Sequence, residues 1–259
     1  MFTLKTSITS FFFRALILTA ITAGALLSTA PAFGWQASGA ADASVVFLEY
    51  EMSSNGLIWG DSIIKRSIII KNNQRFMLEE TDTNTMTTPA ETVDSKETFL
   101  LDADQNIVEY TALHINNTDT TRVAAEVMGR DLVVRGSETG AQLHDWMRVN
   151  RGHYHFTSLY MPIGRLDLSE ETSVKRFIDF GDDHFTIHEN KMTLVGRETV
   201  RMGEISFDCQ IITIDFGHIK GRLWIAKDKW GYFLIKEEAN LEGTGPFEIT
   251  LVQYRRSAQ

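Results

Sequence analysis

The sequence predicts an all-β protein, mainly antiparallel, in which one large curled sheet forms an open or incomplete β-barrel with at most one or two short helices. Short runs rich in Val, Ile, Phe, Trp and Thr recur about every 8 to 12 residues from residue 44 onwards. The Gly-, Asp- and Asn-containing breaks between them are short, as antiparallel hairpins require. A sheet of roughly eleven to thirteen strands curls because strand twist accumulates.

Residues 1–32 have the features of a secretory signal peptide. They contain two basic residues and no acidic residue, an apolar core over residues 15–27, and small residues at Ala30 and Ala32. The apolar core is shorter than the roughly 20 residues of a membrane-spanning helix. We therefore expect cleavage after Ala32 and a soluble periplasmic protein that is not integral to the membrane, with a retained anchor helix as the alternative.

After this segment, the composition divides the chain into a flexible leader at residues 33–43 and one β-sheet domain at residues 44–256. The whole chain has 25 basic and 34 acidic residues, a net charge of −9. This balance disfavours nucleic acid as a partner, because such binders need a basic surface. Cys209 is the only cysteine, so no intrachain disulfide forms, and its alternation with Phe207 and Ile211 predicts a buried strand position.

The first strands are predicted from residue 44 to about residue 80, as two or three long strands with a turn at Asn72 and Asn73. Within them Ile64, Arg66, Ile68 and Ile70 share one face, because strand side chains alternate. The polar, Thr-rich residues 81–94, which include Pro89, are predicted to form a loop.

Three hairpins and a meander follow. The hairpins are predicted at residues 96–115, 120–136 and 177–190, each formed by two apolar runs around a short polar turn. Residues 158–163 are predicted to form one short helix or turn. The meander covers residues 192–254, where short β-rich runs alternate with Gly, Asp, Asn and Lys.

No common catalytic or nucleotide-binding signature is present: neither Gly-x-Ser-x-Gly, nor a phosphate loop, nor Gly-x-Gly-x-x-Gly. The sequence therefore predicts no enzyme, no cofactor and no metal. The weak metal candidates are His153 and His155, which point to one side of a strand and could chelate a metal with His184 or His188. The alternative is that both are ordinary strand histidines.

Aromatic residues are spread along the successive strands, and most belong in the core. A subset could line a cavity for an apolar ligand, because aromatic side chains fill a concave sheet without needing hydrogen-bond partners. The candidate ligand-binding residues are Trp146, Tyr154, Phe156 and Trp224.

Residues 193–200 (TLVGRETV), 203–209 (GEISFDC) and 223–228 (LWIAKD) resemble the closing half of a bacterial periplasmic family, domain of unknown function 3108. The resemblance implies turn or close-approach roles for its glycines, a surface position for Glu198 and a core position for Trp224. That family is distantly similar to the lipoprotein carrier and receptor proteins of the outer-membrane sorting route, which hold acyl chains in an incomplete barrel.

The expected function is that of an exported, non-enzymatic binding or chaperone-like protein that holds a hydrophobic ligand or a lipidated partner in the curved sheet. The carrier resemblance supports it, although the helices that cover the carriers' cavity are not evident in this sequence. The alternative is a structural or protein-interaction factor in envelope assembly with an envelope protein as partner. A metal-dependent enzyme is the least favoured of the three.

Overall fold

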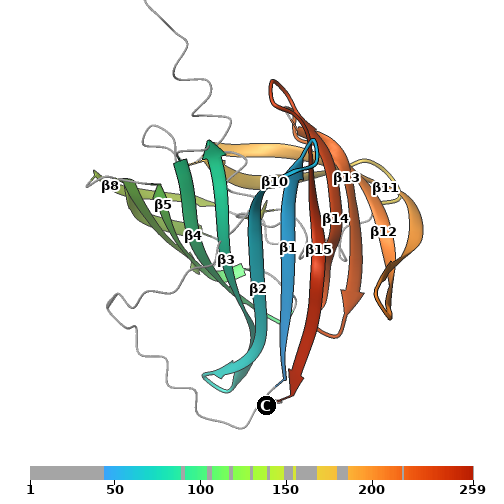
Figure 1. Cartoon of the computed structure of the whole chain (residues 1–259). Helices are drawn as coiled ribbons and strands as arrows, with labels where there is room; N and C mark the ends of the chain where they lie inside the picture. Colours follow the sequence, from blue (N-terminus) through green and yellow to red (C-terminus); the bar gives the residue numbers. More distant parts are fainter. Residues whose placement is uncertain are drawn as a thin grey trace, which may run out of the picture.

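The computed structural model describes residues 44–88, 91–103, 107–116, 119–128, 131–138, 141–148, 154–155, 168–179, 186–217 and 219–258. These residues contain strands and turns and no helix, and they form the curled sheet of Figure 1. The predicted all-β, mainly antiparallel open sheet is therefore confirmed. The signal-peptide segment, the leader and the predicted helix at residues 158–163 lie outside the described residues.

The sheet has 15 strands, more than the sequence predicts. Their bounds are β1 Ser44–Ser54, β2 Leu57–Lys71, β3 Gln74–Thr88, β4 Glu91–Leu101, β5 Ile107–Asn116, β6 Asp119–Met128, β7 Asp131–Glu138, β8 Ala141–Arg148, β9 Tyr154–His155, β10 Thr172–Asp179, β11 Thr186–Met202, β12 Ile205–Asp215, β13 Ile219–Asp228, β14 Gly231–Leu241 and β15 Gly245–Ala258.

The strand order is β8-β7-β6-β5-β4-β3-β2-β1-β15-β14-β13-β12-β11-β10-β9. All pairs are antiparallel except the short β9–β10 pair. Because β8 and β9 are the two ends of this order, the barrel is open along the described residues. Two strand backbones approach closely at Gly221, where a Cβ atom would lie 2.3 Å from the carbonyl oxygen of Glu238 on the next strand.

The predicted turns and hairpins are largely confirmed. Asn72 and Asn73 connect β2 to β3 with φ angles of 53° and 60°, the left-handed conformation of a tight hairpin turn. The three predicted hairpins correspond to the β4–β5, β6–β7 and β10–β11 pairs. The meander corresponds to β11 to β15.

The prediction of a loop at residues 81–94 is wrong. β3 continues to Thr88 and β4 begins at Glu91. Thr81, Thr83 and Thr85 are buried and alternate with the more exposed Asp82 and Asn84, so the segment has the period of two of a half-buried strand. Threonine is β-branched and favours strands, and here its polarity hid that period.

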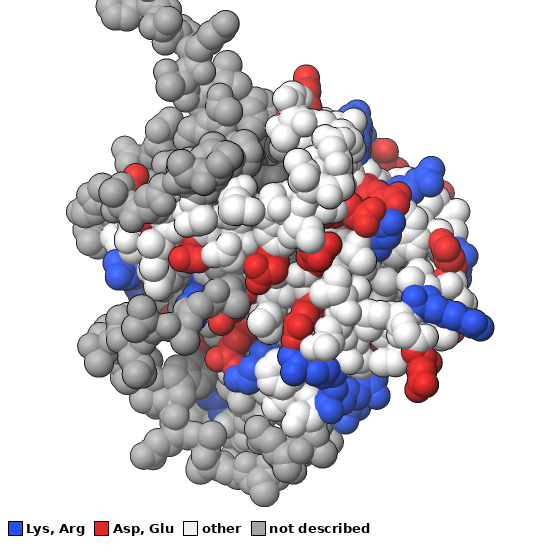
Figure 2. Space-filling view, in the orientation of Figure 1, with Lys and Arg blue, Asp and Glu red and all other residues white. Residues whose placement is uncertain are grey.

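The inner face of the sheet holds the core. Adjacent paired residues share a face, and on β1 the inner residues Val46, Leu48, Tyr50 and Met52 are all buried. Cys209 is buried as predicted, and burial raises the pKa of its thiol to about 11. On the face seen in Figure 2, acidic and basic side chains are interspersed.

One hairpin separates from the sheet. β13 pairs with β12 only as far as Ile225, and β14 pairs with β15 only from Lys236 onwards. Residues 226–235, which we call the flap, therefore pair only within the β13–β14 hairpin. Phe233 and Leu234 point to opposite sides of their strand yet are only 1% and 3% exposed. The flap is thus covered on both faces.

No helix among the described residues is long and apolar enough to cross a membrane.

Candidate functional site

A row of polar side chains crosses the inner face of the sheet from β2 to β6. Ser62 pairs with Thr83, Thr83 with Ser95, Ser95 with His114, and His114 with Thr121. Paired residues lie side by side on one face, and neighbouring strands are about 4.8 Å apart. The register therefore forms a continuous polar band inside the barrel, which we call the polar row.

Four atoms of this row have no hydrogen-bond partner although they are buried. They are the hydroxyl oxygens of Ser62 and Thr83 and both ring nitrogens of His114; in the next row, the hydroxyl of Thr81 is also unpaired. Ser62 is 2% exposed and Thr83 is 1% exposed. Each unpaired buried polar group costs about 1–3 kcal/mol, so such a group of them requires an explanation.

His114 is partly accessible as a residue, but neither of its ring nitrogens reaches solvent. Burial lowers the pKa of its imidazole to about 4, so the ring is neutral at neutral pH. A neutral imidazole has one donor and one acceptor. The polar row thus consists of uncharged groups that can both donate and accept.

Charged residues lie four positions from the polar row on β2 and β3. Arg66 of β2 donates through Nε to a carboxylate oxygen of Glu79 on β3 at 2.5 Å, and both side chains are 2% exposed. Burial alone would lower the pKa of Arg66, but the Glu79 carboxylate more than offsets it and the pKa is raised. Arg66 therefore keeps its charge inside the barrel.

A second buried pair stands beside the first. Tyr110 of β5 donates its hydroxyl to Glu97 of β4 at 2.9 Å, and its ring packs 4.9 Å from that of Phe99. Burial, followed by the Glu97 carboxylate, raises the pKa of Tyr110 well above its usual value. The tyrosine therefore acts as a hydrogen-bond donor and not as an acid.

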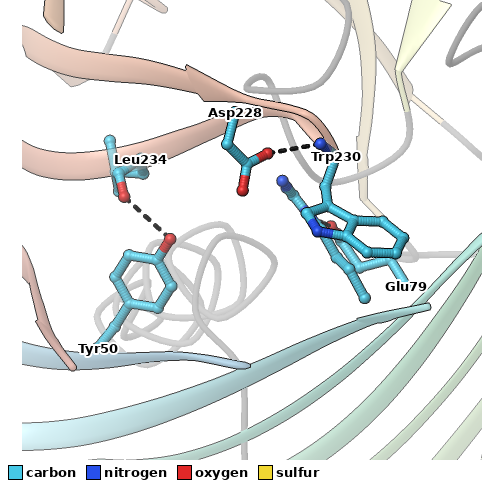
Figure 3. A network of polar contacts seen from close by, with 6 residues as sticks. Tyr50, Glu79, Asp228, Trp230 and Leu234 are labelled. Atoms are coloured by element: carbon cyan, nitrogen blue, oxygen red, sulfur yellow. Dashed lines mark hydrogen bonds and ion pairs between the residues drawn. The ribbon is translucent and has the colours of Figure 1, made fainter. Parts of the chain in front are cut away.

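The flap faces this polar surface. Tyr50 of β1 donates its hydroxyl to the carbonyl oxygen of Leu234 in the flap at 3.0 Å, and Asp228 accepts the backbone N–H of Trp230 at 2.7 Å. Figure 3 shows Tyr50 pointing from its strand towards Leu234 on the ribbon opposite. Trp230 is 4% exposed and its indole N–H has no partner.

Burial raises the pKa of Tyr50 well above its usual value, with Arg66 acting against this rise and Glu79 and Asp228 adding to it. The Tyr50 hydroxyl is therefore influenced by charged residues of β2 and β3 and by Asp228 of the flap. The hydroxyl of Tyr50 stays protonated and available to hold the flap.

The other side of the flap is filled by aromatic rings. Phe207, Phe233 and Tyr254 form a mutual cluster with ring centres 5.3 to 5.6 Å apart. Tyr254 also donates its hydroxyl to Asp228 at 2.7 Å. Burial, followed by this hydrogen bond, raises the pKa of Tyr254 to about 12. This part of the interior is packed with side chains.

The inner face becomes apolar towards β7. Four inner residues on β5, β6 and β7 are buried and aliphatic: Ala112, Val123, Ala125 and Val134. The inner surface from β2 to β7 is therefore amphipathic, with hydroxyls and charges at one side and aliphatic groups at the other.

The sequence-predicted ligand residue Trp224 lies on the opposite face of β13 from buried Leu223. Its indole N–H donates to the carboxylate of Glu198 at 3.0 Å, and the Lys236 ammonium lies 5.9 Å from its ring centre. The residue is half-buried and packs against the core from the outward side of the strand, where it finds a polar partner, so its predicted core position holds only in part. Glu198 is exposed, as the resemblance implied.

The other candidates are placed only in part. Trp146 is in β8, where its backbone pairs with Val133, and Tyr154 and His155 form β9. Phe156, His153 and His184 lie outside the described residues. Arg176 of β10 pairs with both His155 and His188, so these two histidines flank it in the sheet. No group of metal-binding side chains is found among the described residues.

An external groove of about 700 Å³ lies elsewhere, at the end of the barrel. The turn between β1 and β2 contributes Ser53 to Gly56, and β13, β14 and β15 contribute charged and polar residues that include Arg222 and Glu238. Leu57 and Ile58, next to that turn, are 74% and 57% exposed.

No family model matches the chain, and no curated protein matches it. Among solved structures, it is similar to a beta-barrel-like protein of domain of unknown function DUF1849 from Brucella abortus. The TM-score is 0.55 at 12% sequence identity, over 84% of this chain and 98% of that one. At this identity the similarity shows the fold alone. The resemblance to domain of unknown function 3108 stays a prediction.

Proposed function

We propose that this chain is an exported, non-enzymatic binding protein that holds an amphipathic molecule, either a lipid or the lipid part of a partner, inside the curled sheet. The observation that carries the proposal is the set of buried, unpaired polar atoms at Ser62, Thr81, Thr83 and His114 beside aliphatic inner strands. A ligand with a polar head and an apolar body satisfies both surfaces at once.

The flap supplies the second part of this proposal. It is bound to the sheet by side chains, such as Tyr50 and Tyr254, and not by strand ladders on either side. Breaking a few side-chain hydrogen bonds costs much less than breaking a ladder, since each contributes about 0.5–1.5 kcal/mol. The flap is therefore the element that moves when a ligand enters.

The experiment is native mass spectrometry of the full chain, exported by its own N-terminal segment and purified from the periplasm without detergent. We expect an adduct that organic extraction removes and that reappears on exposure to a lipid extract. A mass that equals that of the polypeptide in every preparation would contradict the proposal. A retained divalent metal that is lost in His155→Ala would favour the metal-dependent enzyme instead.

The variant Trp224→Phe tests whether the ligand binds on the inner face or at the ligand-binding residue that the sequence predicts. Because the Trp224 ring bonds to Glu198 on the opposite face from Leu223, we expect this variant to keep the adduct. Loss of the adduct would put the ligand on the outer face and contradict the interior site.

One observation favours the alternative of a protein-interaction factor. The exposed Leu57 and Ile58 adjoin the external groove, and adjacent exposed apolar side chains are typical of docking surfaces. Leu57→Ser with Ile58→Ser would then abolish capture of an envelope protein by crosslinking in the periplasm and leave the adduct unchanged.

A further inference from the structure

The chemistry of the polar row limits the class of head group that the interior takes. The row holds hydroxyls and one neutral imidazole, and each of these groups can donate as well as accept a hydrogen bond. Its unpaired atoms span the four strands β2 to β5, about 14 Å at the usual strand separation. Several hydroxyl groups of one ligand can therefore bind the row together.

An anionic head group does not fit this surface. The buried charged residues on the described inner face of β2 to β5 are the base Arg66 and the acids Glu79 and Glu97. Arg66 is already bound to Glu79. A phosphate or carboxylate placed here would approach two carboxylates while the guanidinium is held by one of them, which is unfavourable at low dielectric.

We infer that the polar row binds the neutral, hydroxyl-rich head group of an amphipathic ligand, such as a sugar or a glycerol ester, through Ser62, Thr83 and His114. This inference rests on the proposed function and names its ligand class. The apolar part of the ligand then lies against the aliphatic inner residues of β5 to β7, of which Val123 and Val134 are examples.

Two probes with the same acyl chain test the head group directly. Glycerol monolaurate carries two free hydroxyls, and laurate carries a carboxylate. Each is titrated into the delipidated protein below its micelle concentration, by calorimetry at pH 7.5. We expect glycerol monolaurate to bind at least about tenfold more tightly, since a tenfold ratio needs about 1.4 kcal/mol.

The variant Ser62→Ala with Thr83→Val tests the residues. It removes two hydroxyls that have no partner inside the protein, so the unfolding temperature should hold or rise. We expect binding of glycerol monolaurate to weaken roughly 5- to 100-fold and binding of laurate to change little. Thr111→Val makes the same change at an exposed position on the outer face of β5 and should leave both affinities unchanged.

The outcomes separate this inference from the proposed function. Equal or tighter binding of laurate, or undiminished glycerol monolaurate binding in the double variant, would overturn the neutral head group while the binding function stands. Binding of neither probe, together with a polypeptide mass free of adducts, would overturn both. In that case ordered water would be what the polar row holds.

Discussion

The two sides of the flap face different kinds of side chain. On the side of β12 and β15, the rings of Phe207, Phe233 and Tyr254 fill the space against it. On the side of β2 to β5, inward positions at the same period of two carry Ser, Thr, Glu, Arg and His. One side is closed by hydrophobic packing, and the other leaves hydrogen-bonding capacity unused.

This difference indicates that the aromatic side contributes to stability and that the polar side serves binding. The aromatic side gains free energy from each buried ring, about 1.5–3 kcal/mol per large apolar side chain. The polar side loses free energy at each unpaired group, so nothing in folding alone favours its residues. A ligand that forms hydrogen bonds with these groups would recover the free energy that they cost.

The largest expected effect comes from the buried ion pair. Arg66→Met leaves the Glu79 carboxylate buried without its partner, and we expect the free energy of unfolding to fall by about 3–5 kcal/mol. Urea denaturation monitored by circular dichroism measures it. We expect a similar loss for Phe233→Ala on the aromatic side, because removing a buried phenyl ring typically costs about 3–5 kcal/mol of unfolding free energy.

The double variant Arg66→Met with Glu79→Leu is the control. Replacing both ions with apolar groups removes the uncompensated charge, so most of the lost stability should return. If the double variant is as unstable as Arg66→Met, the lost stability comes from packing and not from charge. Packing would then determine stability on both sides of the flap.

Much of this architecture follows from the sequence, because hairpin turns and period-two alternation are local. The turn at Asn72 and Asn73 and the shared face of Ile64 and Arg66 were predictable for that reason. The polar row was missed because its member Thr83, like Thr81 in the next row, resembles a loop residue when only polarity is considered. The alternation of Thr with Asp and Asn was the available signal.

A smaller effect is expected from pH, through His114. Its pKa is about 4 in the folded protein and 6.5 in an ordinary environment. Between these values the unfolded chain binds a proton that the folded protein excludes, so stability falls as the pH drops from about 6.5 to about 4. The loss contributed by this residue is about 3 kcal/mol, since one pKa unit corresponds to about 1.36 kcal/mol.

His114→Gln isolates this contribution from the carboxylates that also titrate in this range. Glutamine keeps one donor and one acceptor group but does not titrate. We expect the difference in unfolding free energy between the two proteins to change steadily from pH 7 to pH 4 in favour of the variant. Parallel curves across this range would show that the imidazole is accessible to protons in the folded state.

The flap could not be predicted from the sequence. Residues 226–235 have ordinary strand composition, and their local pattern is that of any hairpin in the meander. They leave the sheet where two ladders end, at the Gln210–Ile225 and Lys236–Thr250 pairs. Local periodicity predicts strands but does not show where the pairing between two of them stops.

The smallest expected effect tests how the flap is held between the two sides. Tyr50→Phe removes the hydroxyl that donates to Leu234, which leaves a buried carbonyl oxygen without this donor and should cost about 1–2 kcal/mol. Because the flap has no ladder to its neighbours, we expect amide exchange in residues 226–235 to accelerate roughly 5- to 30-fold while exchange in β1 and β2 stays unchanged. Tyr232→Phe, which removes a hydroxyl from the flap itself, is the matched control. Equal acceleration throughout the sheet would mean that the flap unfolds only with the whole domain. The polar side would then be no more accessible to a ligand than the aromatic side.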